Sequence, residues 1–338
     1  MKRLVLSLAV VVSGLLSFAQ TNQMVWNNGR MQYAAPIVNV DSLTFPNEVL
    51  ESDTLYFILP RSMKQVVHDT IYKDKLVYVR DTIYIHPNAL EGAFSVAADK
   101  QVAFSKGNLQ YTQSTKTWEF ANEQYEIIGN ANVTNGALAD KIDLFGWSAN
   151  NTTAQWGIST STDIADYSGD FVDWGKNIGD GNTWRTLTID EWAYLFQSRT
   201  DASSKYGVAR INLNADGSQY TNGIIVLPDS WTCPSGITFK SGLASSYGAQ
   251  YYADYQTFTL SQWEQLEQAG AVFLPAAGSR PGSSMYFVQV YGYYWSSSLY
   301  ADDLNYAYGF YFCSNNLNPQ DYGNRYIGQA VRLAQDVK

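Results

Sequence analysis

The feature that most constrains this chain is one uninterrupted stretch, residues 92–338, that is dense in aromatic residues and poor in charge. It contains 20 of the 25 Tyr. The whole chain is 15% aromatic and 16% charged, and soluble domains usually carry about 25% charged residues. Disordered chains have few aromatic residues and a high net charge, so this composition excludes disorder. No low-complexity linker interrupts the stretch. We therefore predict one head domain over residues 92–338.

Charge and cysteine content exclude three other classes of protein. The net charge is −9, whereas a nucleic-acid binder needs a basic footprint for the phosphates. Two Cys cannot hold together a disulfide scaffold of 338 residues. The sequence contains one long apolar run, which excludes a membrane protein with several spans.

That apolar run lies at the N-terminus and has the pattern of a secretory signal. Lys2 and Arg3 precede residues 4–16, which are almost all apolar, and Ser17-Phe18-Ala19 offers a small-x-small cleavage site. A membrane anchor is the alternative, but a spanning helix needs about 20 apolar residues. We predict a signal peptide over residues 1–19 and an exported protein, in the periplasm, at the cell surface or secreted. No Cys follows the run, so the usual bacterial lipid anchor is not indicated.

Two segments separate the signal from the head. In residues 20–48, Asn28-Gly29 between Trp26 and Tyr33 predicts a β-hairpin. In residues 49–91, the motif Asp-Thr-Ile-Tyr occurs twice, ending at Tyr72 and Tyr84, within a strand-like pattern without Gly until residue 92. We interpret residues 49–91 as an extended connector or stalk. The connector contains both histidines of the chain, His68 and His86. Two His without a Cys nearby would make only a weak metal site, so we predict that no metal binds there.

Two helices and two buried strands are indicated within the head. Thr188 with Glu191, and Thr259 with Gln262, each form a capping box ahead of an apolar pattern of helical period. The second helix is expected to stop at Gly270. Two short apolar runs that each end at a Pro predict buried strands: residues 224–227 and 271–274.

The head resembles the formylglycine-generating-enzyme-like branch of the C-type-lectin-like fold, in particular exported proteins common in Bacteroidetes. The resemblance is carried by the words VAFSKGNLQY (102–111), DLFGW (143–147), WRTLT with EW (184–188, 191–192), VLPD (226–229), FLPAAG (273–278), YWSSS (294–298) and VRL (331–333). It implies an α+β fold with two helices, a small antiparallel sheet and long irregular loops, preceded by a short β-rich stalk.

Enzymatic activity is not predicted. Enzymes of that branch use two closely spaced Cys near the C-terminus to bind copper, whereas Cys233 and Cys313 lie far apart in sequence. A disulfide and two free thiols are both compatible with the sequence, and we favour free thiols because Cys313 follows a strand-like run. The head has no His, which excludes Ser-His-Asp and Cys-His chemistry. Asp302 and Asp303 could in principle form a carboxylate pair or a calcium site, but we predict neither, and no cofactor.

The C-terminal part of the head has the composition of a binding surface. Residues 286–326 contain ten Tyr among Asn, Ser, Gly and Asp, the residue types that antibody paratopes use. Part of this set belongs to the core, and we expect Trp295, Phe310 and Phe312 to be buried. Four tyrosines that lie among polar residues are expected to be exposed: Tyr300, Tyr308, Tyr322 and Tyr326.

The same stretch resembles the variable region of C-type-lectin-like proteins that are diversified by retroelements. That resemblance implies ligand contacts at Tyr300, Asp302, Asp303, Asn305, Tyr308, Ser314, Asn315, Asn316, Asp321, Tyr322, Asn324 and Tyr326. The tripeptides of calcium-dependent sugar-binding lectins do not occur, since residues 318–321 read Asn-Pro-Gln-Asp.

The sequence thus predicts an exported binding protein, without enzymatic activity, that contacts a protein or glycan at a cell surface. One alternative is a structural or adhesin subunit of a surface appendage, whose assembly partners pair with the exposed edges of the connector. The other is a copper-dependent oxidase of the formylglycine-generating type.

Overall fold

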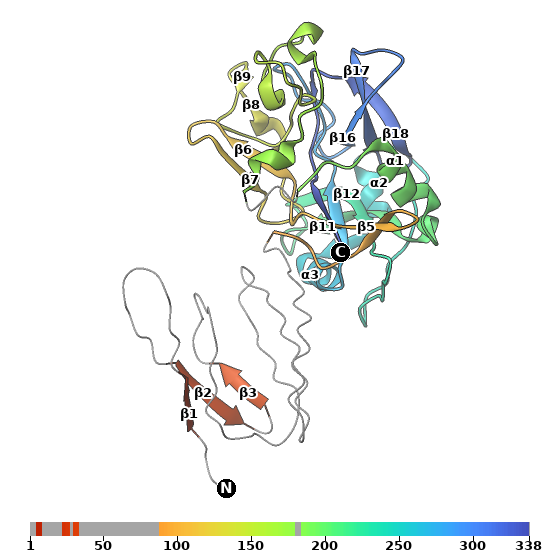
Figure 1. Ribbon diagram of the computed structural model, residues 1–338. Helices are drawn as coiled ribbons and strands as arrows, with labels where there is room; N and C mark the ends of the chain where they lie inside the picture. The colour runs from red at the N-terminus through yellow and green to blue at the C-terminus, as the bar shows by residue number, and fades with distance from the viewer. Residues whose placement is uncertain (1–4, 9–21, 28–29, 34–87, 180–183, 338) are drawn as a thin grey trace. The chain divides into compact units, whose positions relative to one another are not determined.

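The computed structural model describes residues 5–8, 22–27, 30–33, 88–179 and 184–337. The chain divides into two units, Met1–Pro87 and Asn88–Lys338 (Figure 1). Within the described residues, a few short helices combine with several small open sheets, so the fold class is α+β. None of the helices in these residues is long and apolar enough to cross a membrane.

In the first unit, the described residues form one small antiparallel sheet. Its strands are β1 (Val5–Leu8), β2 (Asn22–Asn27) and β3 (Arg30–Tyr33). Asn27 of β2 pairs with Arg30 of β3, which leaves a two-residue connection and confirms the predicted hairpin. The rest of the predicted signal peptide, both Asp-Thr-Ile-Tyr motifs and both histidines lie outside the described residues.

The largest sheet of the second unit has four strands. In spatial order they are β13 (Thr257–Thr259), β11 (Tyr206–Asn212), β12 (Tyr220–Val226) and β14 (Val272–Pro275). The pair β11–β13 is parallel and the other pairs are antiparallel. The two predicted buried strands are neighbours in this sheet, where Ile225 pairs with Phe273, and both residues are fully buried.

The sheet that positions the candidate site has three antiparallel strands, in the order β16 (Gly292–Leu299), β17 (Tyr306–Phe312) and β18 (Leu317–Asn324). Two further three-stranded sheets consist of β20 (Ala334–Asp336), β5 (Lys100–Phe104) and β4 (Phe94–Ala97), and of β10 (Lys141–Ile142), β6 (Leu109–Thr112) and β7 (Thr117–Phe120). Two short pairs complete the strands: β15 (Arg280–Pro281) with β19 (Ile327–Gly328), and β8 (Val133–Thr134) with β9 (Ala137–Leu138).

Both predicted capping boxes are present. Helix α1 (Ile189–Ala193) begins after Thr188 and continues as a π-helical turn, Tyr194–Ser198. Helix α3 (Leu260–Gln268) begins after Thr259 and is followed by Gly270, whose φ of +90° suits glycine. Short 3₁₀ turns lie at Gly129–Asn132, Gln155–Gly157, Ile164–Tyr167, Trp174–Asn177 and Ala202–Ser204.

The expectation of two helices was incomplete, because a third helix, α2 (Gln250–Tyr255), lies between them in sequence. Its N-cap is Ala249, which makes no side-chain capping hydrogen bond. A helix of this length without a cap leaves no sequence pattern to detect, and its position depends on tertiary contacts such as the buried Tyr252.

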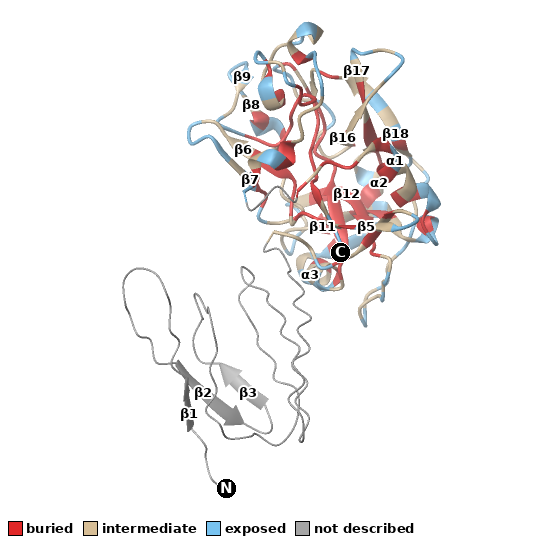
Figure 2. Ribbon diagram, viewed as in Figure 1, coloured by how far each residue is buried: buried red, intermediate tan, exposed pale blue. Residues whose placement is uncertain are grey.

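The core of the second unit is built around tryptophans, and its buried segments appear red in Figure 2. Trp192 of α1 stacks on Phe310 of β17, with ring centroids 5.1 Å apart. A neighbouring group of buried apolar side chains includes Trp295 of β16, and a third includes Trp263 of α3. Trp295, Phe310 and Phe312 are all buried, as predicted.

Candidate functional site: an exposed tyrosine cluster

Each face of strand β17 is buried over one half of the strand and partly exposed over the other half, and the buried half differs between the two faces. Successive strand residues point to opposite faces. The pairing of β17 is regular with β18 from Tyr306 to Gly309 and with β16 from Gly309 to Phe312. On one face, Phe310 and Phe312 are buried in the core around Trp192, while Tyr306 and Tyr308 are partly exposed. On the other face, Ala307 is buried and Tyr311 is partly exposed. Each face therefore has a covered half and an open half.

Four tyrosines meet on the open half of the first face. Tyr308 lies directly opposite Tyr322 of β18. The Tyr300 ring stacks on Tyr322, with centroids 4.5 Å apart and planes 20° apart. It also makes edge contacts with Tyr306 and Tyr308 at 6.3 and 5.1 Å. We call Tyr300, Tyr306, Tyr308 and Tyr322 the tyrosine cluster. Its most exposed member is Tyr322, with 51% of its surface accessible.

The loop that carries Tyr300 is held by hydrogen bonds. Asp303 Oδ1 accepts from the Asn305 N–H at 2.9 Å, and the Asp303 carbonyl accepts from the Tyr306 N–H at 3.0 Å. The buried Arg325 donates to the carbonyl oxygens of Leu304 and of Gly169, at 3.1 and 2.7 Å. Its guanidinium also lies over the ring of Trp147, 4.4 Å from the centroid. The loop is thereby anchored to the core on one side, and the Asp302 side chain is left exposed.

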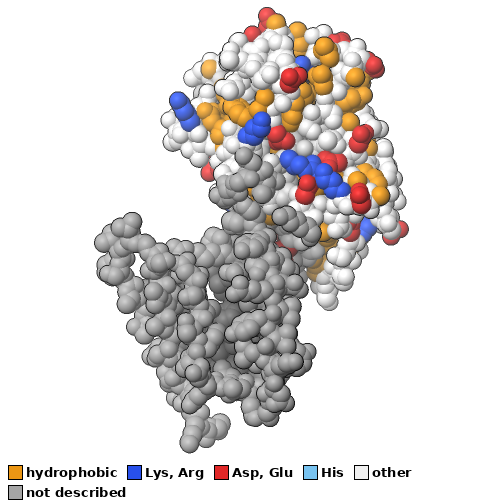
Figure 3. All heavy atoms as spheres, in the orientation of Figure 1, with side chains coloured by type: hydrophobic (Ala, Val, Ile, Leu, Met, Phe, Trp, Pro, Cys, Tyr) orange, Lys and Arg blue, Asp and Glu red, His pale blue; other side chains and the backbone are white. Residues whose placement is uncertain are grey.

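The cluster has little charge of its own. Desolvation and then the neighbouring Asp302 carboxylate raise the pKa of Tyr300 above its ordinary value of 10.0. Asp302 and Asn305 are exposed, and Asp303 and Asn324 are half-buried. Most of the visible surface of the described head carries uncharged or hydrophobic side chains (Figure 3). The site therefore presents amphipathic rings within a rim of short polar side chains.

The twelve residues implied by the resemblance do not form one surface. Seven belong to the tyrosine cluster or its rim: Tyr300, Asp302, Asp303, Asn305, Tyr308, Tyr322 and Asn324. Asn315, Asn316 and Asp321 accompany the other face of the sheet, since Asp321 lies opposite Gly309 and Asn316 Nδ2 lies 3.5 Å from the Tyr311 hydroxyl. Tyr326 follows the end of β18 and is half-buried. Of the four tyrosines expected to be exposed, Tyr322 is exposed and the other three are half-buried.

Ser314 is a correction to the implied set, because it is fully buried. Its hydroxyl donates to the Ser246 carbonyl at 2.8 Å and accepts from the Gly248 N–H at 3.1 Å. A polar side chain with both partners satisfied inside the protein has a structural role. The sequence context of Ser314, next to exposed Asn315, gave no indication of this.

Tyr306 is a member of the cluster that the implied set left out. Its spacing of two residues from Tyr308 is the strand period, and that period could have placed both rings on one face. The position of Tyr300 in the cluster depends on the path of the loop that carries it, and the two-residue period of a strand does not predict that path.

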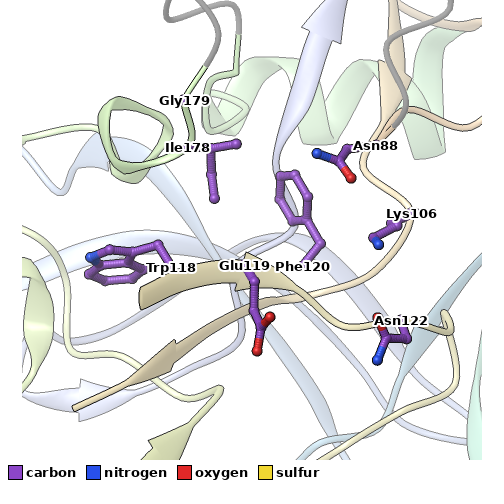
Figure 4. Close-up of a pocket in the computed structure, with 8 residues that line it drawn as sticks. All are labelled: Asn88, Lys106, Trp118, Glu119, Phe120, Asn122, Ile178 and Gly179. Atoms are coloured by element: carbon purple, nitrogen blue, oxygen red, sulfur yellow. The ribbon is translucent and has the colours of Figure 1, made fainter. Parts of the chain in front are cut away.

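A shallow depression of about 240 Å³ lies elsewhere on the head (Figure 4). Trp118 and Phe120 of β7 line it from one side of the strand, while the Glu119 side chain points away from them (Figure 4). Glu119, Lys106 and two asparagines form the polar part of its lining. The described lining residues include no Ser, Thr, Cys or His.

The thiols and acidic groups do not assemble into a metal centre within the described residues. No group of three or more His, Cys, Asp or Glu side chains there is placed to hold a metal ion. Cys233 and Cys313 are free, as favoured from the sequence. The Cys233 thiol lies 3.3 Å from the Ile237 carbonyl, and the Cys313 thiol lies 3.3 Å from Asn315 Oδ1.

The comparisons with known proteins leave the geometry as the main guide to function. No family model, no curated protein and no solved structure matches this chain.

Proposed function

We propose that this chain is an exported binding protein of the cell surface, without enzymatic activity, whose C-type-lectin-like head contacts a protein or glycan through the tyrosine cluster. The observation that carries the proposal is the stacking of Tyr300 on the exposed Tyr322. Packed tyrosines offer a large amphipathic contact area at a low entropic cost, because the rings are already ordered before a ligand binds.

The rim supports the same function. Asp302, Asn305 and Asn324 can exchange hydrogen bonds with a ligand's amides or hydroxyls around the apolar centre. This arrangement of an aromatic centre within a polar rim is common in interfaces. The resemblance to diversified variable proteins adds that the rim positions are those at which ligand contacts are expected.

A binding screen with matched variants tests the proposal. The purified full chain is applied to an array of extracellular proteins and to an array of glycans, together with the double variant Tyr300→Ser/Tyr322→Ser and the control Tyr251→Ser. Tyr251 is a partly exposed tyrosine of α2, so it controls for the loss of a tyrosine as such. We expect a ligand whose affinity falls at least tenfold in the double variant and is unchanged in the control. Equal binding by all three proteins would remove the tyrosine cluster from the site.

Two further measurements address export and diversification. N-terminal sequencing of the protein from a secreting host is expected to begin at Gln20. Sequencing of the 3′ end of the gene across isolates is expected to show substitutions concentrated in residues 299–326, with residues 294–298 and 331–332 constant. Equal constancy throughout would favour one fixed ligand or an assembly contact.

A further inference from the structure

A second aromatic surface lies on the open half of the opposite face of the same sheet. It consists of six residues, which we call the Phe287 surface: Tyr247, Tyr286, Phe287, Tyr291, Tyr293 and Tyr311. Tyr286, Phe287 and Tyr247 are 50%, 49% and 47% exposed. Phe287 contacts Tyr291 edge to face at 4.8 Å, and Tyr247 lies 5.5 Å from the same ring. These residues come from three separate segments of the chain, so the surface is a product of the fold.

Phe287 is displayed from an unusual backbone conformation. Its φ is +60°, and that of Gln289 is +66°. Large side chains rarely adopt this left-handed region, which glycine occupies without cost. Such strain persists only where the surrounding structure imposes it, and it occurs preferentially at functional sites.

Buried polar contacts hold the residues that follow Phe287 in this loop, Gln289 and Val290. The Asn222 N–H donates to Gln289 Oε1 at 2.7 Å, and Asn222 Nδ2 donates to the Gln289 carbonyl at 2.8 Å. The Tyr252 hydroxyl donates to the Val290 carbonyl at 2.8 Å. Asn222 and Tyr252 are fully buried, so the core itself holds the loop that presents the Phe287 ring.

The ring geometry favours a protein over a sugar as the occupant. Tyr291, Tyr293 and Tyr311 stack on one another, with centroid distances of 5.4–5.5 Å and interplanar angles of 18–28°. The three centroids are nearly equidistant, so the rings overlap only in part. Beside these tyrosines, with their hydroxyl groups, lies the Phe287 ring, which is 49% exposed and offers no hydrogen-bonding group to a sugar's hydroxyls. A protein pocket matches both parts, since it takes up the apolar ring and hydrogen-bonds the hydroxyls.

The charge around the surface indicates the character of that pocket. Burial and then the Asp321 carboxylate, the Cys313 thiol and Tyr247 raise the pKa of Tyr293 to about 12, and no Lys or Arg among the described residues offsets them. The exposed Asn315 and Asn316 add neutral amides at the edge, and the whole chain carries a net charge of −9. A basic or hydrogen-bond-donating rim is the complement to such a surface.

We propose that the Phe287 surface is a second binding site, separate from the tyrosine cluster, and that it docks a protein partner whose apolar pocket accepts Phe287 within a basic rim. The site is independent of the proposed function, because the two surfaces occupy opposite faces of the sheet and share no residue.

Panning of a random peptide library displayed on phage tests this site. The library is panned in parallel on the full chain and on Phe287→Gly, with Tyr322→Ser as the control on the other face. Glycine favours the backbone conformation of residue 287, so the variant removes the ring without adding strain. We expect the full chain to enrich peptides that combine an aliphatic or aromatic residue with Lys or Arg. Their affinity should fall at least tenfold in Phe287→Gly and change less than twofold in Tyr322→Ser.

Several outcomes would overturn the proposal. These are enriched peptides that bind Phe287→Gly equally well, peptides that depend on Tyr322 instead, and the absence of any enriched sequence. Binding on a glycan array that is lost in Phe287→Gly would assign the surface to a sugar. A dimer in sedimentation that dissociates in Phe287→Gly would assign it to a second copy of the chain. If a thermal melt shows that Phe287→Gly is unfolded, Tyr311→Ser replaces it under the same criteria.

Discussion

Arg185 holds both carboxylate oxygens of Glu191, with Nη1–Oε2 and Nη2–Oε1 distances of 2.7 and 2.9 Å. The same carboxylate accepts the Thr188 N–H at 2.9 Å, which closes the capping box of α1. Lys100 of β5 lies 2.9 Å from it as well. A single side chain therefore connects the start of α1 to two basic groups, and its charge state affects all three contacts.

The first prediction concerns the pH dependence of this contact. Burial alone would raise the pKa of Glu191, but hydrogen bonds from Arg185, Thr188 and Lys100 outweigh it and hold the pKa below its ordinary value of 4.5. A carboxyl group whose pKa is lower in the folded than in the unfolded state stabilises the fold at pH values above the unfolded-state pKa. This contribution is lost as the pH falls through the folded-state pKa. We expect Glu191→Gln to lower the free energy of unfolding by about 2 kcal/mol at neutral pH. Urea unfolding should show a smaller difference near pH 3. An equal difference at both pH values would contradict this assignment.

A second prediction separates packing from hydrogen bonding at Trp192. The ring is fully buried and stacks on Phe104 and Phe310. Its Nε1 has no hydrogen-bond partner among the described residues. Trp192→Ala should lower the free energy of unfolding by about 3–5 kcal/mol. Trp192→Phe keeps a stacked ring and removes the unpaired N–H, so it should lose less than half as much in the same urea titration. Equal losses would show that the indole N–H matters.

The third prediction follows from the burial of Ser314. Ser314→Ala leaves the Ser246 carbonyl and the Gly248 N–H without their partner. We expect a loss of about 1–3 kcal/mol in unfolding free energy, with ligand affinity unchanged once the protein is folded. Asn315→Ala, one residue away and exposed, is the control and should change stability by less than about 0.5 kcal/mol. A weaker ligand affinity without a loss of stability would return Ser314 to the binding set.

The fourth prediction concerns the reactivity of the two thiols. Cys313 is buried and Cys233 is partly exposed. An aromatic disulfide reagent should modify Cys233 in the folded chain and Cys313 only after denaturant is added. Cys233→Ser should then abolish the reaction under native conditions. Binding should persist in Cys233→Ser/Cys313→Ser. Copper binding by the full chain that is lost in Cys313→Ser would instead support the oxidase alternative.

Much of the local structure could be predicted because it depends on short-range chemistry. The Thr188 and Thr259 capping boxes appear in the sequence as fixed spacings, and both are formed. The pairing of β2 with β3 on either side of Asn28-Gly29 has the same local character. The apolar runs before Pro228 and Pro275 lie in buried strands, because a short run of consecutive apolar residues is typical of a strand that is buried on both faces.

The division of the site into two surfaces could not be predicted in this way. It depends on which half of each sheet face the core covers, and only tertiary packing determines that. Phe287 is displayed with a positive φ two residues before Gln289, and Gln289 is held by Asn222, which is 67 residues earlier in the chain. No period or composition encodes such a contact. The resemblance to variable proteins implied residues of the tyrosine cluster and others that accompany the opposite face, without indicating that the two sets face apart. It implied no member of the Phe287 surface.

The alternation along β17 also determines how this protein can change over time. Tyr308 and Tyr311 are three positions apart, yet substitutions at one leave the surface of the other intact because they point to opposite faces. The two surfaces can therefore acquire new specificities separately, within one strand. Insertion of a single residue between them is a different event, since it would turn every following side chain to the other face. We infer that this strand tolerates exchange of side chains but not a change in length.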